Sequence, residues 1–278
     1  MLNRIEIQRK DGGVLTLPIY DATNYQIKDI QGLDPVKANI VTSSFAHIDG
    51  SQFQSSRREM RNLVIKLGID SLGVGLTTQE LRKELYSYLM PKTDVTIKFI
   101  RDNLDAVIIS GQVESFDSPL FVKEPEATIS ILCFDPDFKS DSALIANGLT
   151  VTTGLEYADL EVNYLGEVDS GFVFSFTPTI TITSFTLQNT LSDGSVRKFI
   201  FDATGAPILS GNTLKISTIP GDKYVRITRT GVESSILWAM DPASDWIALY
   251  PGTNLLRVTT NFSGRAYSIS YNNRFGGL

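Results

Sequence analysis

The chain has 278 residues, which is long enough for two domains with separate cores. A hydrophobic fraction of 42% and a charged fraction of 20% are typical of a globular protein and exclude a disordered or fibrous one. The net charge of −6 argues against nucleic-acid binding, which needs a concentrated positive field. No stretch approaches the roughly 18 apolar residues of a membrane span. Because residues 1–9 alternate like a strand and do not resemble a signal peptide, we expect a protein made in a cytosol.

The first half of the sequence predicts mainly strands. Asp11-Gly12-Gly13 predicts a hairpin turn between the first two strands, and residues 101–105 predict a second hairpin. The strands expected in this half are 4–8, 14–17, 62–67, 95–100, 107–109, 113–116 and 128–134.

One helix is predicted, at about residues 78–90. Thr77 and Glu80 have the spacing of a capping box, in which each side chain accepts a hydrogen bond from the other residue's backbone. An apolar face follows at helical spacing, and Pro91 ends the run. We expect this face, made of Leu81, Leu85, Tyr88 and Leu89, to pack on the sheet.

The segment between Gly32 and Arg61 has little periodicity. Connections of this length within a compact domain are uncommon and often functional. We interpret it as an extended loop or β-arm that reaches a neighbouring molecule, and a surface loop without a partner is the alternative. The candidate interface residues in it are His47, Phe53, Arg57 and Arg58, with Phe53 as an apolar anchor and the arginines as pairing charges.

Composition changes near residue 138. Residues 1–137 contain 34 charged residues and 8 threonines, whereas residues 138–278 contain 22 and 17. A threonine-rich half with few charges is typical of a β-sandwich. We therefore predict two domains, 1–137 and 138–278, with the boundary at Asp135-Pro136-Asp137.

The second half predicts a β-sandwich of jelly-roll type. We expect one alternating strand over 179–187, with a bulge at Ser184. Near the end, 246–250 reads as an apolar strand that turns at Pro251-Gly252-Thr253-Asn254 into a returning strand. The other expected strands are 196–201, 214–217, 224–228 and 255–260.

Residues suited to catalysis are scarce. The one histidine, His47, would have to serve any triad or histidine-based zinc site, and we interpret it as a surface or interface residue. Cys133 lies in an apolar run, where a buried structural thiol is expected rather than a reactive one. The close carboxylate pairs lie in expected turns, so turn formation explains them better than a glycosidase or a calcium site does. These pairs are Asp102 with Asp105, Asp135 with Asp137, and Asp241 with Asp245. We expect no enzyme activity, no metal and no cofactor.

Aromatic residues in the second half suggest a different kind of site. Sandwiches can bind sugars on exposed aromatic faces, and Trp238 and Trp246 are the candidate glycan contacts. Packing in the core is the stronger interpretation for most of the aromatic side chains in this half.

The order of segments resembles one family. A strand pair leads into Ile30-Gln31-Gly32-Leu33-Asp34-Pro35, and the long segment and the capped helix follow. Ser110-Gly111-Gln112-Val113-Glu114-Ser115 comes next, and the first half closes with Ile131-Leu132-Cys133-Phe134-Asp135-Pro136. Leu249-Tyr250-Pro251-Gly252-Thr253-Asn254 lies near the end of the sandwich. Each motif is a common turn, but their order resembles the distal tail proteins of long-tailed, non-contractile bacteriophages.

This resemblance implies a structural protein of the virion tail tip, assembled in the host cytoplasm. Members of the family form a hexameric ring that joins the tail tube protein to the tail-tip hub or baseplate. The resemblance implies an N-terminal β-barrel-like or sandwich-like domain with one helix that builds the ring. It also implies a galectin-like C-terminal sandwich that docks receptor-binding proteins or host glycans. The alternative function is a carbohydrate-binding β-sandwich module that contacts the host surface.

Overall fold

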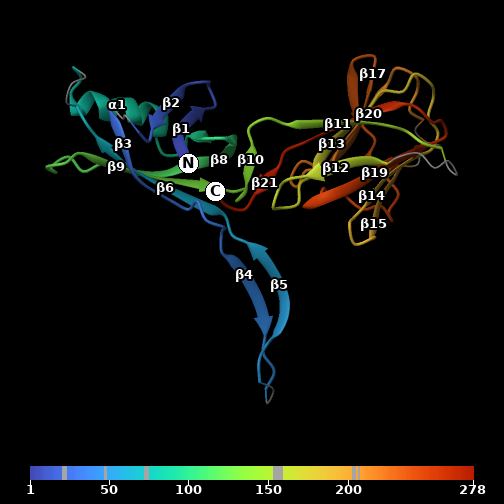
Figure 1. Ribbon diagram of the computed structural model, residues 1–278, viewed down its shortest axis with the longest axis horizontal. Coiled ribbons are helices and arrows are strands. Elements are labelled where there is room, and N and C mark those ends of the chain that lie inside the picture. The colour runs from blue at the N-terminus through green and yellow to red at the C-terminus, as the bar shows by residue number, and fades with distance from the viewer. Residues whose placement is uncertain (21–23, 47–48, 72–74, 153–158, 202–204, 206) are drawn as a thin grey trace. The chain divides into compact units, whose positions relative to one another are not determined.

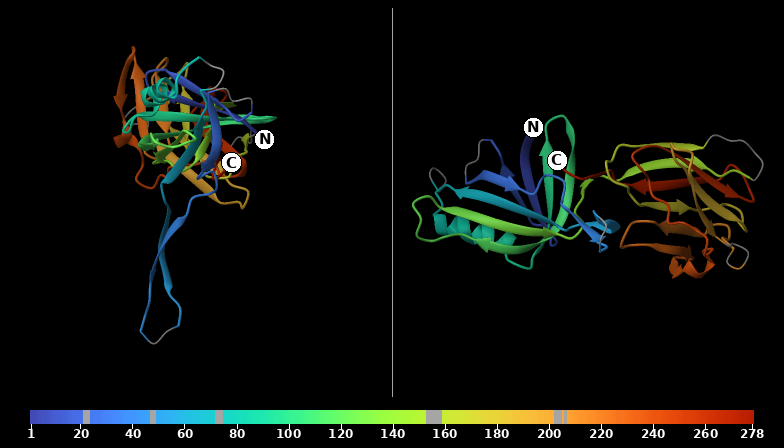
Figure 2. Two further views of the ribbon diagram at one scale, coloured as in Figure 1. Left: turned by 90° about the vertical axis from the view of Figure 1, so that its left-hand side faces the viewer. Right: turned by 90° about the horizontal axis from the view of Figure 1, so that it is seen from below.

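The computed structural model describes residues 1–278 except 21–23, 47–48, 72–74, 153–158, 202–204 and 206. The chain divides into two compact units. The first comprises Met1–Asp141 together with Phe275–Leu278, and the second comprises Ser142–Arg274. Both are built almost entirely from antiparallel strands, and the described residues contain one α-helix, so the predicted mainly β fold is confirmed (Figures 1 and 2).

The first unit is a sheet that covers an apolar core. Within the described residues nine strands form it, in the order β2-β1-β7-β8-β9-β6-β3, with β10 beside β8 and β21 beside β10. Alternate side chains are buried in one cluster, which includes Ile5, Ile65 and Phe99. The strands are β1 (Leu2–Arg9), β2 (Val14–Pro18), β3 (Tyr25–Gln31), β6 (Arg61–Ile69), β7 (Asp94–Arg101), β8 (Leu104–Asp117), β9 (Glu126–Cys133), β10 (Phe138–Ser140) and β21 (Arg274–Phe275).

The helix α1 (Thr78–Leu89) begins at the predicted capping box. The Thr77 backbone N–H donates to Glu80 Oε2 at 2.7 Å, and the Glu80 backbone N–H donates to Thr77 Oγ1 at 3.3 Å. The hydrogen bond from the Thr77 backbone lowers the pKa of the Glu80 carboxyl. The side chains of Leu81, Leu85 and Leu89 are buried in the core of the first unit, so the predicted apolar face is confirmed.

The segment after β3 forms a two-stranded hairpin that projects from the sheet of the first unit (Figure 1). Its strands are β4 (Ala38–Ser43) and β5 (Gln52–Arg58), and they pair only with each other among the described strands. Every residue of β5 is exposed. An extended loop and a β-arm were both compatible with the sequence, and the structure shows the arm.

The last residues of the chain return to the first unit. The backbone N–H of Leu278 donates to the Leu33 carbonyl at 3.1 Å, and Phe275 packs against the first core. Strand β10 also pairs with β8 of this unit. The predicted division after residue 137 assigned all later residues to the second half. In the structure residues 138–141 and 275–278 lie with the first unit, because these sheet and backbone hydrogen bonds hold them there.

The second unit consists of two antiparallel sheets that share one core. In the part of the chain that the structure describes, their orders are β11-β20-β13-β16-β17-β18 and β12-β19-β14-β15. Phe174 from the first sheet and Phe185 from the second lie 5.4 Å apart between ring centroids, which places the core between the sheets. The elements are β11 (Leu144–Leu149), β12 (Leu160–Tyr164), β13 (Phe172–Phe176), β14 (Phe185–Thr190), β15 (Val196–Phe201), β16 (Thr213–Ser217), β17 (Tyr224–Arg229), β18 (Val232–Ser235), the 3-10 helix η1 (Leu237–Ala239), β19 (Gly252–Thr260) and β20 (Ala266–Tyr271).

The expected strand over 179–187 is mostly wrong. Strand β14 begins only at Phe185. Before it, the backbone of Ile182 exchanges hydrogen bonds with Ile208, and the backbone N–H of Thr183 donates to Asn261 Oδ1 at 3.0 Å. These partners outside the sheet satisfy the backbone, so the alternating pattern does not become a strand.

The expected hairpin at Pro251-Gly252 is also wrong. Residues 246–251 form no strand, although Leu249 makes an isolated bridge with Ser170. Strand β19 begins at Gly252, which has a φ of +93°, and it pairs with β14 and β12. The buried side chain of Asn254 bonds the backbone of Tyr250 at both its N–H (3.0 Å) and its carbonyl (2.8 Å). This turn therefore depends on a buried amide and not on strand pairing.

The projecting hairpin as candidate functional site

The arm, which we define as residues 38–58, presents apolar side chains to solvent. Phe53 is 61% exposed, and Ile40, Val41 and Phe45 are exposed as well. A two-stranded hairpin that buries no apolar face is at best marginally stable in water. An exposed hairpin with several apolar side chains therefore has the composition of a docking element.

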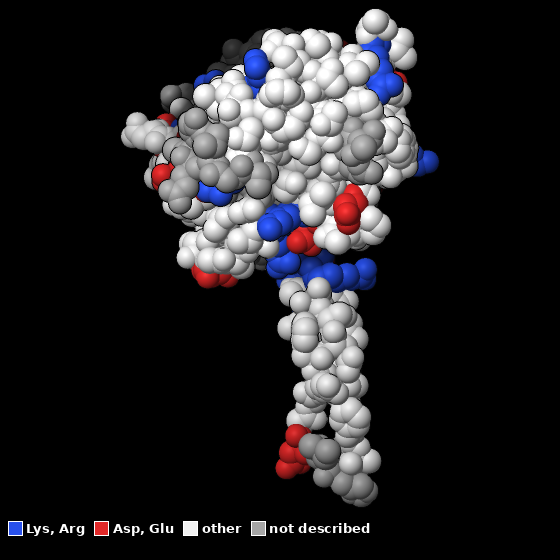
Figure 3. Space-filling view, turned by 90° about the vertical axis from the view of Figure 1, so that its right-hand side faces the viewer, with Lys and Arg blue, Asp and Glu red and all other residues white. Residues whose placement is uncertain are grey.

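Basic residues gather where the arm leaves the sheet. In the pairing of β4 with β5, Ala38 lies opposite Arg58 and Asn39 lies opposite Arg57. Lys37 directly precedes Ala38. Figure 3 shows Lys and Arg side chains grouped at this base of the hairpin. Lys37 and Arg57 are exposed and form no ion pair among the described residues, so they are the basic groups that the arm base offers to a partner.

Arg58 pairs within its own chain. Its guanidinium makes a two-pronged ion pair with the carboxylate of Asp137, and the Nη2–Oδ2 distance is 2.8 Å. Asp137 is 1% exposed, so the pair joins the end of β5 to a buried charge of the first unit. The sequence interpretation of Asp137 as a turn residue missed this role.

Arg61, at the start of β6, holds both the entrance and the exit of the arm. Its side chain is buried and donates to the carbonyl oxygens of Asp34 (2.7 Å) and Pro136 (2.7 Å), and it also donates to that of Gly32. The guanidinium carbon lies 4.4 Å from the ring centroid of Phe138. Desolvation by burial lowers the pKa of Arg61. Arg58 and Arg61 together fix the direction in which the arm leaves the sheet.

The structure brings most of the predicted interface residues together on the arm. Phe53, Arg57 and Arg58 all lie on β5, and His47 falls outside the described residues. Sequence reasoning missed the exposed apolar residues near β4, and it missed Arg61 as the residue that anchors the arm. The run Ile40-Val41-Thr42 on a polar segment is a strand signal that could have identified the first of these.

The two tryptophans of the second unit differ in their surroundings. Trp246 is half-buried and packs against Phe199, with ring centroids 5.9 Å apart, and Lys223 Nζ lies 5.3 Å from the centroid of its ring. Trp238, on η1, is 68% exposed. Trp246 thus belongs to the edge of the core, and Trp238 is the aromatic face open to solvent.

The surroundings of the other residues considered for chemistry give them structural roles. Cys133 is buried and free, and burial raises the pKa of its thiol to about 11. Asp241 accepts the backbone N–H of Ala243 at 2.8 Å, as expected for a turn residue. In the described ranges no three His, Cys, Asp or Glu side chains group as metal ligands would, and no helix there is long and apolar enough to span a membrane.

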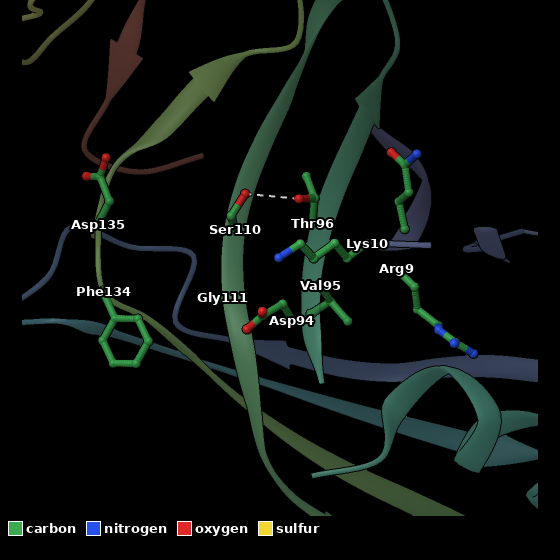
Figure 4. A pocket seen from close by; sticks show the side chains of 10 residues that line it. Arg9, Lys10, Asp94, Val95, Thr96, Ser110, Gly111, Phe134 and Asp135 are labelled. Carbon is green, nitrogen blue, oxygen red and sulfur yellow. Dashed lines mark hydrogen bonds between the residues drawn. The ribbon is translucent and has the colours of Figure 1, made fainter. Parts of the chain in front are cut away.

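An open groove of about 560 Å³ lies on the first unit (Figure 4). It is lined by residues of β1, β7 and β8 and by the segment after β9. Thr96 Oγ1 and Ser110 Oγ are hydrogen-bonded at 3.0 Å on its wall, and the ring of Phe134 lies across from them. The groove combines hydroxyls and charged groups with one exposed aromatic ring.

The chain has the fold of the phage distal tail proteins. It superimposes on the SPP1 Dit (gp 19.1) protein, described as a paradigm of the hub adsorption apparatus in phages that infect Gram-positive bacteria, with a TM-score of 0.69 at 16% identity. The match covers 98% of this chain and 99% of the SPP1 protein. The resemblance predicted from the order of segments is thereby confirmed at the level of the fold.

A second solved structure is also similar. A chain of the phage P2 baseplate in its activated conformation with Ca matches with a TM-score of 0.50 and 10% identity, over 100% of both chains. No protein-family model matches the sequence, and no curated protein matches it. At these identities the likeness defines the fold and leaves the activity to be argued from the residues.

Proposed function

We propose that this protein is a structural component of a phage tail tip, a distal tail protein that forms a hexameric ring between the tail tube and the tail-tip hub or baseplate. The observation that carries the proposal is the match of both units, in one chain, to the SPP1 hub protein. A tail-tip role makes the protein part of the virion, assembled in the host cytoplasm, and gives it no catalytic task. It also makes tail tube protein, hub protein and receptor-binding proteins its partners.

The arm supports a ring assembled head to tail. Such interfaces bring unlike surfaces together and close by rotation. The arm projects away from the sheet of its own unit (Figure 2). Its apolar residues Phe53, Ile40 and Val41 are exposed. Arg58 and Arg61 hold its base in place. We expect Phe53 to be the apolar anchor on the neighbouring protomer and Arg57 to pair with a carboxylate there. Arg58 instead positions the arm.

The test is the absolute mass of the purified protein by light scattering at increasing concentration. We expect a species of six protomers. A variant in which residues 39–57 are replaced by a two-residue Asn-Gly turn should keep the thermal stability of the wild type and lose the hexamer, because the arm contributes nothing to the core. A matched control, Arg229→Ala on β17 of the second unit, should keep the hexamer. A wild type that stays monomeric at high concentration would contradict the ring.

A second candidate function is carbohydrate binding by the second unit. Trp238 supports it, because an exposed indole can stack on a sugar ring. Tryptophan fluorescence during titration with host cell-wall glycans tests this function. We expect saturable quenching that Trp238→Ala abolishes and Trp246→Phe retains. Equal quenching in the Trp238→Ala variant would rule out Trp238 as the sugar platform.

A further inference from the structure

The loop between β8 and β9 presents three consecutive apolar side chains to solvent. Phe121 is 99% exposed, and its neighbours Leu120 and Val122 are exposed as well. We call residues 120–122 the tip. Exposed runs of apolar residues are uncommon in soluble proteins unless they serve a contact.

The base of this loop is held by a buried arginine. Arg82, on α1, donates from Nη2 to the Pro119 carbonyl at 2.6 Å and from Nε to Ser118 Oγ at 3.0 Å. Ser118 Oγ in turn donates to the Glu126 carbonyl at 2.7 Å, which ties the two ends of the loop together. The base of the loop is thus held in place, and a docking element on a fixed base loses less conformational entropy on binding than one on a free loop.

The groove of Figure 4 offers the tip an aromatic surface. Phe134, which follows β9, lines the groove and is 69% exposed. Phe134 can therefore pack against Phe121, since paired aromatic rings attract each other in addition to burying apolar area.

The charges around the groove and the tip are complementary. Arg9 and Asp135, which line the groove, already form ion pairs with Asp11 and Lys139. The other charged side chains of the lining are Lys10 and Asp94, and among the described residues neither forms an ion pair. Asp94 accepts a hydrogen bond from Gln112 at 3.2 Å and remains exposed. The groove therefore keeps one basic and one acidic group for a partner.

The loop carries the matching pair directly after the tip. Lys123 is exposed and has no ion pair in the part of the chain that the structure describes. Glu124 approaches Lys28 at 3.6 Å, but its side chain stays 80% exposed. Lys123 can thus face Asp94, and Glu124 can face Lys10, when the tip enters the groove.

The positions of tip and groove exclude a contact within one chain. They lie at opposite ends of β9, whose eight residues span about 26 Å. A tip can therefore fill only the groove of another copy. Such a contact joins two different surfaces, as the head-to-tail interface of a ring does.

We propose that the tip of one protomer docks in the groove of a second copy of this chain, with Phe121 against Phe134 and Lys123 facing Asp94. This contact is a second interface beside the arm. Two copies of the chain suffice to form this contact. The contact rests on the proposed function only in that the ring would close through it.

Disulfide trapping tests the contact without assuming a ring. Lys123→Cys and Asp94→Cys are made as separate variants, each in a Cys133→Ala background, and are mixed under mild oxidation at high concentration. We expect roughly tenfold more covalent dimer in the mixture than in either variant alone, because docking holds the two thiols together. The matched control uses Asp102→Cys in place of Asp94→Cys. Asp102 is an exposed aspartate directly after the other end of β7, and this control should give no dimer above background.

The results that would overturn the contact differ from those that would overturn the ring. No excess dimer in the mixture overturns it, and so does efficient linkage of Lys123→Cys to itself, which would mean that two loops meet. If Phe121→Ser still forms the hexamer of the wild type and no cross-link forms, the ring stands without this contact. If the mixture cross-links but the wild type never reaches six protomers, the result supports the contact and contradicts the ring.

Discussion

The Nη2 atom of Arg61 donates a hydrogen bond of 2.6 Å to the carbonyl oxygen of Gly276, a residue 215 positions later in the chain. The same guanidinium bonds the carbonyls of Asp34 and Pro136. A single side chain therefore joins the segment that enters the arm, the segment that precedes β10 and the returning segment after β21. All three lie in the first unit.

Replacement of Arg61 should destabilise the first unit strongly. In Arg61→Met, partly buried backbone carbonyls lose their donor, and a buried group left unsatisfied costs about 1–3 kcal/mol. We expect a loss of roughly 3 kcal/mol or more in the free energy of unfolding, measured by urea denaturation. Arg57→Ala, on the exposed arm, is the control and should change stability by less than about 0.5 kcal/mol. Equal stability of the two variants would show that the carbonyls find other partners.

The ion pair between Arg58 and Asp137 should control the direction of the arm. Arg58→Ala leaves the carboxylate of Asp137 buried without this cation, which we expect to cost about 2 kcal/mol because Arg58 itself is partly exposed. Limited proteolysis should then cleave the base of the arm faster than in the wild type. The double variant Arg58→Ala/Asp137→Asn should regain part of the stability, since the buried charge is gone. Additive effects of the two changes would mean that the residues are not coupled.

The side chain of Asn254 should be essential to the sandwich of the second unit. It is buried, and its Oδ1 accepts a hydrogen bond of 3.0 Å from Asn189 Nδ2 in addition to its bonds with the backbone of Tyr250. Asn254→Ala should lower the free energy of unfolding by about 2 kcal/mol, because these buried groups lose their partners. Thr253→Ala, one position away and exposed, is the control. Calorimetry that resolves the two units should show the loss in the second unit, and a loss in the first unit would refute this role.

The thiol of Cys133 should stay protonated and unreactive in the folded protein. Burial raises its pKa to about 11, so the folded state holds the proton more tightly than the unfolded state does. The resulting stabilisation is fully present below the unfolded pKa, near 9, and should be lost as the pH rises from about 9 to 11.

Thiol labelling measures this protection. At pH 8 we expect a thiol reagent to modify Cys133 only as fast as the protein unfolds. Phe134→Cys in a Cys133→Ala background, at an exposed position, should react at once. Equally fast modification of the wild type would disprove the burial of the native thiol.

Short-range signals explain what could be predicted well from the sequence. The capping box at Thr77 and Glu80 and the glycine turn after β1 involve neighbouring residues, and both are present in the structure. The predicted strands that failed, at 179–184 and 246–250, have a strand-like pattern but bond partners such as Ile208 and Ser170. Periodicity cannot identify such partners, because they are distant in sequence.

The same distinction between local and distant signals applies to the residues of the candidate site. Phe53 and Arg57 on the arm could be found because the segment itself is unusual. The roles of Arg58 and Arg61 depend on Asp137 and on carbonyls that lie far away in the sequence. The exposure of Phe121 was likewise invisible, because an apolar Leu-Phe-Val run reads as part of a strand.

Electron microscopy of the negatively stained protein, at a concentration where light scattering shows the largest species, tests the ring most directly. The account predicts class averages with sixfold symmetry around a central channel, and a variant without the arm should yield none. Particles that remain single copies, or that form closed pairs with twofold symmetry, would contradict it.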